Sequence, residues 1–278
     1  MKIDSHQHFW QYNEVDYVWM GEVHNAIKKN FLPNDLQPLL KENNLDGSIA
    51  VQARQTIAET NFLLGLASNN SIIKGVVGWV PLCETDVEGV VEKYAAEKNI
   101  VGFRHVIHDE PDDLFILRKD FNNGIKCLKN HSLCYDILIF EKHLPQTIKF
   151  VDQHPEIDMV IDHIAKPRIS HSKFDHNWAE NIKQLAAREN VTCKLSGMVT
   201  EVIDGKWDTS LLQPYFDIVL EAFGPDRLMF GSDWPVCLIQ SNYTKWVDTI
   251  KSFISSLSLF EQSAIMGGNV KRIYLSSK

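Results

Sequence analysis

The chain has 278 residues and a formal net charge of −8, with 44% hydrophobic and 23% charged residues. Because no basic surface is available to neutralise phosphates, this balance excludes nucleic acid and anionic membranes as partners and favours a small-molecule ligand. Five cysteines without C-x-x-C spacing, no apolar run of about 18 residues and no signal-peptide pattern indicate a cytoplasmic protein with reduced thiols.

Short strand-like runs alternate along the whole chain with segments of helical periodicity. The predicted strands are residues 2–8, 47–52, 73–79, 101–105, 134–139, 159–163, 191–195 and 228–232. The predicted helices are residues 34–40, 59–68, 87–98, 120–129, 145–153, 177–188, 212–222 and 243–253, although Gly124 is unfavourable inside the fourth. Alternation of this kind is typical of parallel βα units, and eight units close a barrel. We therefore predict an α/β fold, a (β/α)8 TIM barrel formed as a single domain by residues 1–278.

An open doubly wound sheet is the main alternative fold. It would need a glycine-rich turn after the first strand, where a phosphate could approach the backbone. The chain instead has His6-Gln7-His8-Phe9-Trp10 there, and these bulky side chains exclude that turn.

Histidines His6 and His8 end the first predicted strand. Residues i and i+2 of a strand point to the same face, so the two imidazoles would lie side by side and form half of a metal site. His163 and Asp233 follow later apolar runs, and the carboxyl ends of barrel strands meet at one mouth. Three imidazoles and a carboxylate suit zinc, and a coordination position left for water would make the site catalytic.

The chemistry expected of this cluster is activation of water. A bound metal lowers the pKa of water from about 16 to about 7, and Asp233 would take the proton and pass it to a leaving oxygen. Two other interpretations remain open from the residues alone. The histidine pair could be a surface or packing feature, and Asp233 could cap a turn because Trp234-Pro235 follows.

Arg104 and His105 end the fourth predicted strand. The arginine could clamp a carboxylate or polarise a carbonyl with paired N–H donors, or it could form a surface salt bridge. His105 could be a ligand, a base or a hydrogen-bonded core histidine, and the sequence does not separate these roles.

Further candidates for the barrel mouth follow other strands. Arg54 and Trp79 would face the substrate, the indole offering the apolar plane on which sugars are often held, although packing of Trp79 in the barrel is an alternative. Asp136 and Lys194 are candidates of the same kind, and Ser196-Gly197 is predicted to be a turn. The chain has no G-x-S-x-G and no H-E-x-x-H motif, so serine hydrolase and zincin chemistry lack support.

Several segments together resemble one family, the amidohydrolase superfamily, and within it the sugar-lactonase branch, typical members of which hydrolyse L-fuconolactone and L-rhamnonolactone. The segments are His6-Gln7-His8-Phe9-Trp10, Gly102-Phe103-Arg104-His105, Asp162-His163-Ile164-Ala165-Lys166-Pro167, Cys193-Lys194-Leu195-Ser196-Gly197, the stretch 223–235 and Gly267-Gly268-Asn269.

The resemblance implies a distorted barrel with metal ligands at His6, His8, His163 and Asp233. It implies hydrolysis of L-fuconolactone or a related deoxy-sugar lactone, with Asp233 as base and then acid. Charge on the carbonyl oxygen would be stabilised by a metal, or by Arg104 and histidines such as His163. The substrate would be bound by Arg54, Trp79, His105 and Asp136.

The chain departs from the two-metal members of this superfamily. Those members carry a bridging lysine or glutamate and a further histidine at the ends of strands four and five, where this chain has Arg104-His105 and the run 135–140. We therefore expect one divalent ion, zinc, or no metal at all. The competing hypotheses are a metal-dependent decarboxylase of an aromatic acid on the same scaffold, and a barrel that binds without catalysis.

Overall fold

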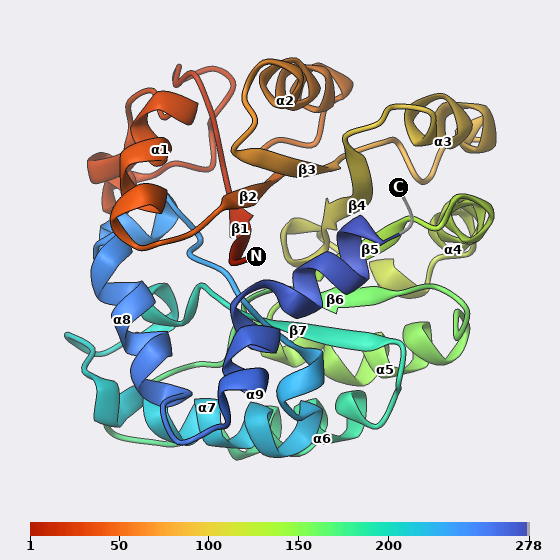
Figure 1. Ribbon diagram of the computed structural model, residues 1–278. Coiled ribbons are helices and arrows are strands. Elements are labelled where there is room, and N and C mark those ends of the chain that lie inside the picture. The colour runs from red at the N-terminus through yellow and green to blue at the C-terminus, as the bar shows by residue number, and fades with distance from the viewer. Residues whose placement is uncertain (277–278) are drawn as a thin grey trace.

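Eight parallel strands follow one another around a barrel in the order of the chain, and helices lie outside them (Figure 1). This computed structural model describes residues 1–276 and confirms the predicted single-domain (β/α)8 barrel. The strands are β1 (Ile3–Gln7), β2 (Gly47–Val51), β3 (Ile73–Gly78), β4 (Ile100–Val106), β5 (Cys134–Leu138), β6 (Met159–Ile161), β7 (Val191–Leu195) and β8 (Leu228–Phe230).

The barrel closes just beyond β8, through the residues that follow it. Asp233 donates its backbone N–H to the carbonyl of His6 at 2.8 Å, and His8 donates to the carbonyl of Trp234 at 2.7 Å. Gly231 allows the close approach, because a Cβ there would lie 2.9 Å from the Cβ of His6. The ends of the first and last strands are thus joined at the predicted metal ligands.

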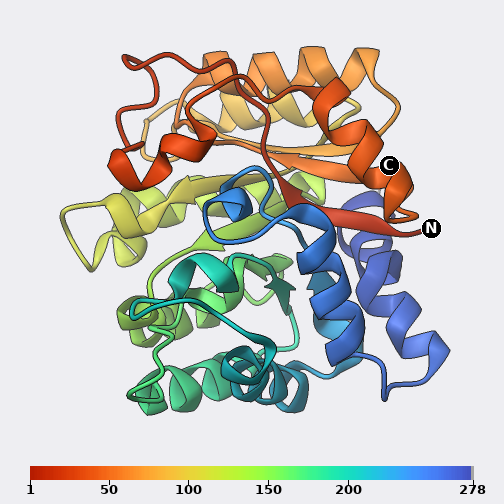
Figure 2. The same ribbon diagram turned by 90° about the vertical axis from the view of Figure 1, so that its left-hand side faces the viewer.

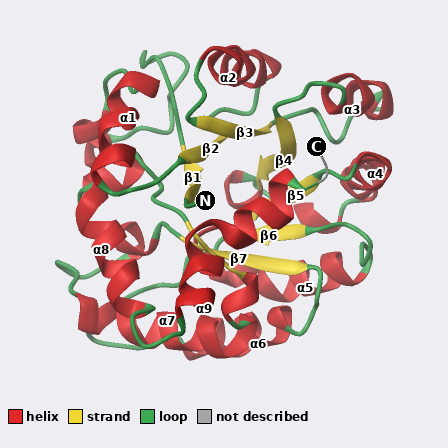
Figure 3. Cartoon of the chain, viewed as in Figure 1, coloured by secondary structure: helices red, strands yellow, loops and turns green. Residues whose placement is uncertain are grey.

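The helices form an outer ring around the strands (Figure 3). They are α1 (Pro33–Glu42), α2 (Ile57–Asn69), α3 (Val87–Ala95), α4 (Lys119–Cys127), α5 (Leu144–Asp152), α6 (His176–Ala186), α7 (Thr209–Phe223), α8 (Tyr243–Phe253) and α9 (Leu259–Ser263). Five of them begin at a polar side chain that accepts a backbone N–H of the first turn: Thr56, Asp175, Asp208, Asn242 and Ser258. Among the described residues, no helix has the length and apolar character that a membrane span requires.

The two ends of the barrel differ. The C-terminal segment η11 (Lys271–Leu275), blue in Figure 1, lies across one end, where Tyr274 and Val270 pack on apolar interior residues such as Ile3 and Val160. The connections that follow β1 and β4 lie on the opposite side from the N-terminus (Figure 2). The carboxyl ends of the strands are therefore the open end of the barrel.

Two strands end two residues earlier than predicted. β6 stops at Ile161 rather than residue 163, and β8 stops at Phe230 rather than residue 232. The reason is the backbone that follows them, because His163 has φ 55° and Asp233 has φ 56°, both in the left-handed region. The structure also contains α9, which the periodicity did not predict.

Gly124 lies inside α4 as predicted, and the fold explains why the helix tolerates it. A Cβ at Gly124 would lie 2.1 Å from the carbonyl oxygen of Leu82, which precedes α3. Glycine is therefore required by the close packing of α4 against this connection, and its low helix propensity is offset by that packing.

We predict that Gly124→Ala destabilises the protein by about 1–3 kcal/mol, because the overpacking outweighs the roughly 1 kcal/mol by which alanine favours a helix. Gly89→Ala in α3 is the matched control, since Gly89 is exposed and a Cβ there meets no atom within 4 Å. It should stabilise by about 0.5–1 kcal/mol. Urea unfolding measures both, and equal stabilisation by the two substitutions would contradict the packing argument.

Candidate active site

A pocket of about 550 Å³ opens at the carboxyl ends of the strands. His8, Arg104, His163 and Asp233 are among the residues that line it. The apolar part of the pocket wall includes Val106, Leu138, Val236 and Ile239. The polar part includes His24, His108, Lys166 and Glu201.

The side chains of three predicted metal ligands, all histidines, converge on an oxygen atom of the fourth, Asp233. Oδ1 of Asp233 lies 3.4 Å from Nε2 of His8, 3.8 Å from Nε2 of His6 and 3.9 Å from Nε2 of His163. All four side chains are buried. The structure therefore brings together residues from the two ends of the chain, from His6 to Asp233.

The backbone after β6 and β8 is what turns two of these side chains inward. Residues 163 to 166 all have positive φ, between 47° and 62°, and Asp233 has φ 56°. Each non-glycine residue held in this region costs roughly 1–3 kcal/mol, so the surroundings must fix it. Trp178 of α6 helps by donating its indole N–H to the carbonyl of Ile164 at 2.6 Å.

Hydrogen bonds behind two of the imidazoles fix their orientation. Nδ1 of His8 donates to the carbonyl of Val51 at 2.7 Å, which leaves the lone pair of Nε2 facing Asp233. Nδ1 of His163 is bonded to Oγ of Ser196 at 2.8 Å. Gly197 makes room for this ring, because a Cβ there would lie 2.5 Å from Nδ1 of His163.

Arg104 lies beside the same cluster and is almost fully buried, so it is not a surface salt bridge. Its Nη1 donates to Oδ2 of Asp162 at 2.8 Å and lies 3.3 Å from Nε2 of His6. Its Nη2 donates to the carbonyl of Gln52. Its Nε is buried and has no hydrogen-bond partner within residues 1–276.

Two cations and two anions lie together beneath His6, and we call Arg104, Lys194, Asp136 and Asp162 the interior charge cluster. Nζ of Lys194 lies 2.5 Å from Asp136 and 2.9 Å from Asp162, and Tyr274 donates its hydroxyl to Asp136 at 2.7 Å. Burial alone would lower the pKa of Lys194, but the two carboxylates raise it above its usual value. Lys194 is therefore an ammonium ion at neutral pH.

The pKa values of the cluster around Asp233 are also shifted. Burial opposes ionisation of Asp233, but His163, His8 and Lys166 together hold its pKa below the usual value. Burial lowers the pKa of His163 well below 6.5 despite the attraction of Asp233. At neutral pH the site therefore pairs a carboxylate with a neutral imidazole, the forms that bind a metal or accept a proton.

These residues fit a single divalent ion. Nε2 of His6 and Nε2 of His8 are 3.2 Å apart, close to the edge of about 3.3 Å that two nitrogens form around tetrahedral zinc at about 2.0 Å. His6, His8 and Asp233 each offer one ligand atom, and these three atoms lie within 4.8 Å of one another, as do one ligand atom each of His6, Asp162 and His163. The donor set of imidazole and carboxylate suits zinc.

His105 and Trp79, which were predicted to bind the substrate, lie outside the pocket lining. Alternation along β4 explains this, because Arg104 points into the barrel and its neighbour points to the helices. The His105 ring stacks on Phe115 at 4.9 Å and bonds Glu110 at 2.6 Å. The indole N–H of Trp79 donates to Nδ1 of His105 at 3.3 Å.

Arg54 and Asp136 are also outside the lining. Arg54 donates to Glu59 at 3.0 Å and pairs with Asp16 at 2.9 Å, so it anchors the β1–α1 connection to the start of α2. Asp136 faces the interior of the barrel, as the alternation of β5 requires, but lies below the pocket in contact with Lys194 and Tyr274.

Sequence reasoning assigned no role to several residues that the structure places around the cluster. Asp162 and Ser196 bond the rings of His6 and His163, while Lys166 and Glu201 pair at the pocket wall. Lys194 is different, because this charged residue of β7 was already a candidate in the sequence analysis. The other roles depend on contacts between distant loops.

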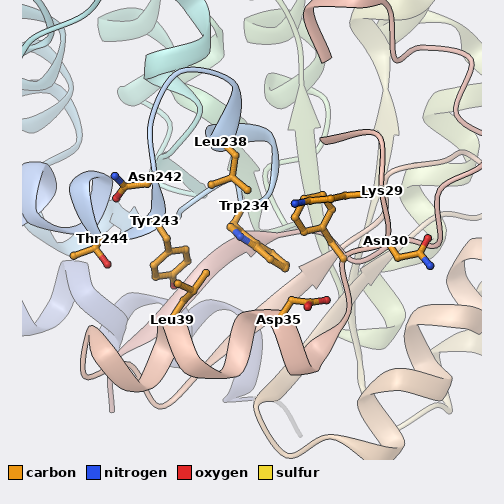
Figure 4. Close-up of a pocket in the computed structure, with 10 residues that line it drawn as sticks. Lys29, Asn30, Asp35, Leu39, Trp234, Leu238, Asn242, Tyr243 and Thr244 are labelled. Atoms are coloured by element: carbon orange, nitrogen blue, oxygen red, sulfur yellow. The ribbon is translucent and has the colours of Figure 1, made fainter. Parts of the chain in front are cut away.

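A second hollow, of about 500 Å³, lies between α1, α8 and the residues after β8 (Figure 4). Figure 4 shows the rings of Trp234 and Tyr243 beside Leu39 within it. It contains none of the titratable cluster described above. We therefore place the candidate active site in the pocket with Asp233.

The chain is similar over nearly its whole length to known proteins of one family. The model of the amidohydrolase family matches residues 3–275. An L-fucono-1,5-lactonase of Burkholderia multivorans is 39% identical over 99% of this chain and 96% of its own length, and one of Burkholderia ambifaria is 34% identical over 98% and 95%. The crystal structure of a Burkholderia multivorans amidohydrolase with bound zinc superposes with a TM-score of 0.93, at 39% identity and 99% coverage of both chains.

We predict that Gly197→Ala displaces the His163 ring and lowers the catalytic rate by at least tenfold, since a misplacement of about 1 Å can cost on the order of 100-fold. Gly224→Ala is the control, because Gly224 also has a φ of 66°, with a different ψ of 168°, and a Cβ there meets no atom within 4 Å. Both variants should lose stability from the positive φ, about 1–2 kcal/mol at Gly197 and about 1–3 kcal/mol at Gly224. Equal activity in the two variants would show that the position of His163 does not depend on Gly197.

Proposed function

The chain belongs to the amidohydrolase family, and we propose that it hydrolyses the ring ester of a sugar lactone, in the first place L-fucono-1,5-lactone or a related deoxy-sugar lactone. The observation that carries the proposal is the convergence of Asp233, three imidazoles and Arg104, all of which except His6 line one pocket. The lactonase relatives support the choice of substrate class.

The charge of the pocket favours an uncharged substrate. Its two strong cations, Arg104 and Lys166, are already paired with Asp162 and Glu201 in the part of the chain that the structure describes. A carboxylate ligand would lack an unpaired cation to bind, whereas the hydroxyl groups and carbonyl of a sugar lactone need only hydrogen bonds. This disfavours the decarboxylase hypothesis, because that substrate is an aromatic acid.

Asp233 is placed to handle the protons of the reaction. Its carboxylate can accept a proton from the attacking water while the water oxygen bonds to the ring carbonyl carbon. When the bond from that carbon to the ring oxygen breaks, Asp233 returns the proton to the departing oxygen. The only product is the sugar acid, because the ester lies within the ring and its hydrolysis opens the ring without loss of carbon.

Arg104 is placed to stabilise the charge that develops on the carbonyl oxygen. Its guanidinium is fixed by Asp162 and by the carbonyl of Gln52, so it does not have to reorganise during the reaction. Its guanidinium lines the pocket, so its positive charge lies close to where the oxygen would sit. His163 is held by Ser196, and its Nε2 lies 3.9 Å from Oδ1 of Asp233, so this ring can orient the carboxylate or the water.

We further propose that His6, His8, His163 and Asp233 can hold one divalent ion, zinc in the first place. Such an ion supplies Lewis acidity and a more acidic water. A second ion is not expected, because Arg104 and Lys194 already bring positive charge to the interior.

We predict that Asp233→Asn lowers kcat by about 100- to 10,000-fold, since it removes the proton acceptor while keeping the shape of the side chain. Asp109→Asn removes a negative charge from the same pocket at a more exposed position, and its kcat should stay within a few-fold of the wild type. Circular dichroism confirms that both variants are folded. Full activity of Asp233→Asn would remove Asp233 from the mechanism.

A second prediction concerns the substrate and the metal. In a pH-indicator screen of sugar lactones, L-fucono-1,5-lactone should release acid without carbon dioxide, and a chelator should lower the rate without abolishing it because Arg104 and Asp233 remain. Carbon dioxide release from an aromatic acid would support the decarboxylase instead. No turnover of any lactone would favour a barrel that only binds.

A further inference from the structure

The ring of His6 has two opposite hydrogen-bonding partners at one nitrogen. Nδ1 of His6 lies 3.2 Å from Nζ of Lys194, a donor, and 3.2 Å from Oδ1 of Asp162, an acceptor. All three side chains are fully buried, so water does not compete for these bonds. The tautomer of His6 is therefore determined by which of the two partners it uses.

The donors of Lys194 favour an unprotonated Nδ1. An ammonium group has three N–H donors, and Lys194 has three acceptors in reach: Asp136 at 2.5 Å, Asp162 at 2.9 Å and Nδ1 of His6 at 3.2 Å. If Nδ1 of His6 carried the proton, the third donor of a fully buried ammonium would lose this acceptor. Leaving a buried donor unsatisfied is costly.

The contact between His6 and His8 favours the same tautomer. Their Nε2 atoms are 3.2 Å apart, and Nδ1 of His8 donates to the carbonyl of Val51, so Nε2 of His8 is an acceptor. A proton on Nε2 of His6 makes this contact a hydrogen bond, and without that proton two lone pairs face each other. A proton on Nε2 has one cost, because Nη1 of Arg104 carries two N–H groups and lies 3.3 Å from Nε2 of His6 as well as 2.8 Å from Asp162, so the longer of its two contacts is given up.

We propose that Lys194 is a positioning residue for His6, whose Nδ1 it holds so that the proton of the neutral ring stays on Nε2 in the metal-free protein. Nε2 is the nitrogen that faces the metal ligands His8 and Asp233, and a protonated Nε2 cannot bind a metal. Metal binding then requires the other tautomer, in which Nδ1 donates to Asp162. Lys194 and Asp162 thus oppose each other in setting the metal affinity of the site.

This inference uses the single-ion site proposed above but no property of the substrate. Nitrogen-15 NMR of the wild-type protein, without lactone, reports which ring nitrogen carries the proton, with the His6 ring assigned through bonds from its backbone. Without metal, His6 should be protonated at Nε2 and His8 at Nδ1. On addition of Zn²⁺, the His6 proton should move to Nδ1. A His6 ring protonated at Nδ1 in the metal-free protein would overturn the proposal and leave lactone hydrolysis untouched.

Two variants separate hydrogen bonding from charge. Lys194→Met removes both the donor and the charge, whereas Lys194→Gln removes the charge and keeps a donor. Lys194→Met should protonate His6 at Nδ1 and bind Zn²⁺ on the order of 10- to 100-fold more tightly by competition with a chelator. Lys194→Gln should show a smaller gain.

Equal gains in the two variants would mean that charge alone acts, and would overturn the positioning role. Cys193→Ala is the control on the same strand, because this side chain faces the helices, and it should leave the affinity unchanged. If the Lys194 variants do not fold, the wild-type spectra decide the question alone.

Discussion

The mutual pairing of four buried charges is the constraint on which the rest of this site depends. Arg104, Lys194, Asp136 and Asp162 sit inside the barrel, and each touches a partner of opposite sign. Removing one partner of such a group typically costs about 3–5 kcal/mol, because the charge left behind stays buried. The cluster separates the apolar end of the barrel, closed by Tyr274, from the polar pocket, and it holds both His6 and Arg104 in place.

Strain at two strand ends adds the second constraint. His163 and Asp233 reach the pocket only because the backbone turns into the left-handed region directly after β6 and β8. Asp233 is at the same time the residue whose N–H closes the barrel onto β1. The geometry of the site and the closure of the fold therefore stabilise each other, which lets a strained backbone persist where chemistry needs it.

The barrel and the ligand quartet could be predicted because they follow from local rules. Eight βα units fix the topology, and the i, i+2 spacing of His6 and His8 puts both rings on one face. The substrate residues could not be predicted as a set. Arg104 and His105 are neighbours on one strand and so face opposite sides, which the alternation of β4 already implied.

The remaining assignments depend on partners that no local pattern reveals. Arg54 turns back to Glu59 and Asp16, and Asp136 is held below the pocket by Lys194 and Tyr274 from the far end of the chain.

The most direct test of this site is a crystal structure with an unreactive lactam analogue of L-fucono-1,5-lactone. We expect the carbonyl oxygen to lie within hydrogen-bond distance of Arg104 and the carbonyl carbon to face Oδ1 of Asp233. An analogue bound beside Trp234 and Tyr243, away from Asp233, would contradict it.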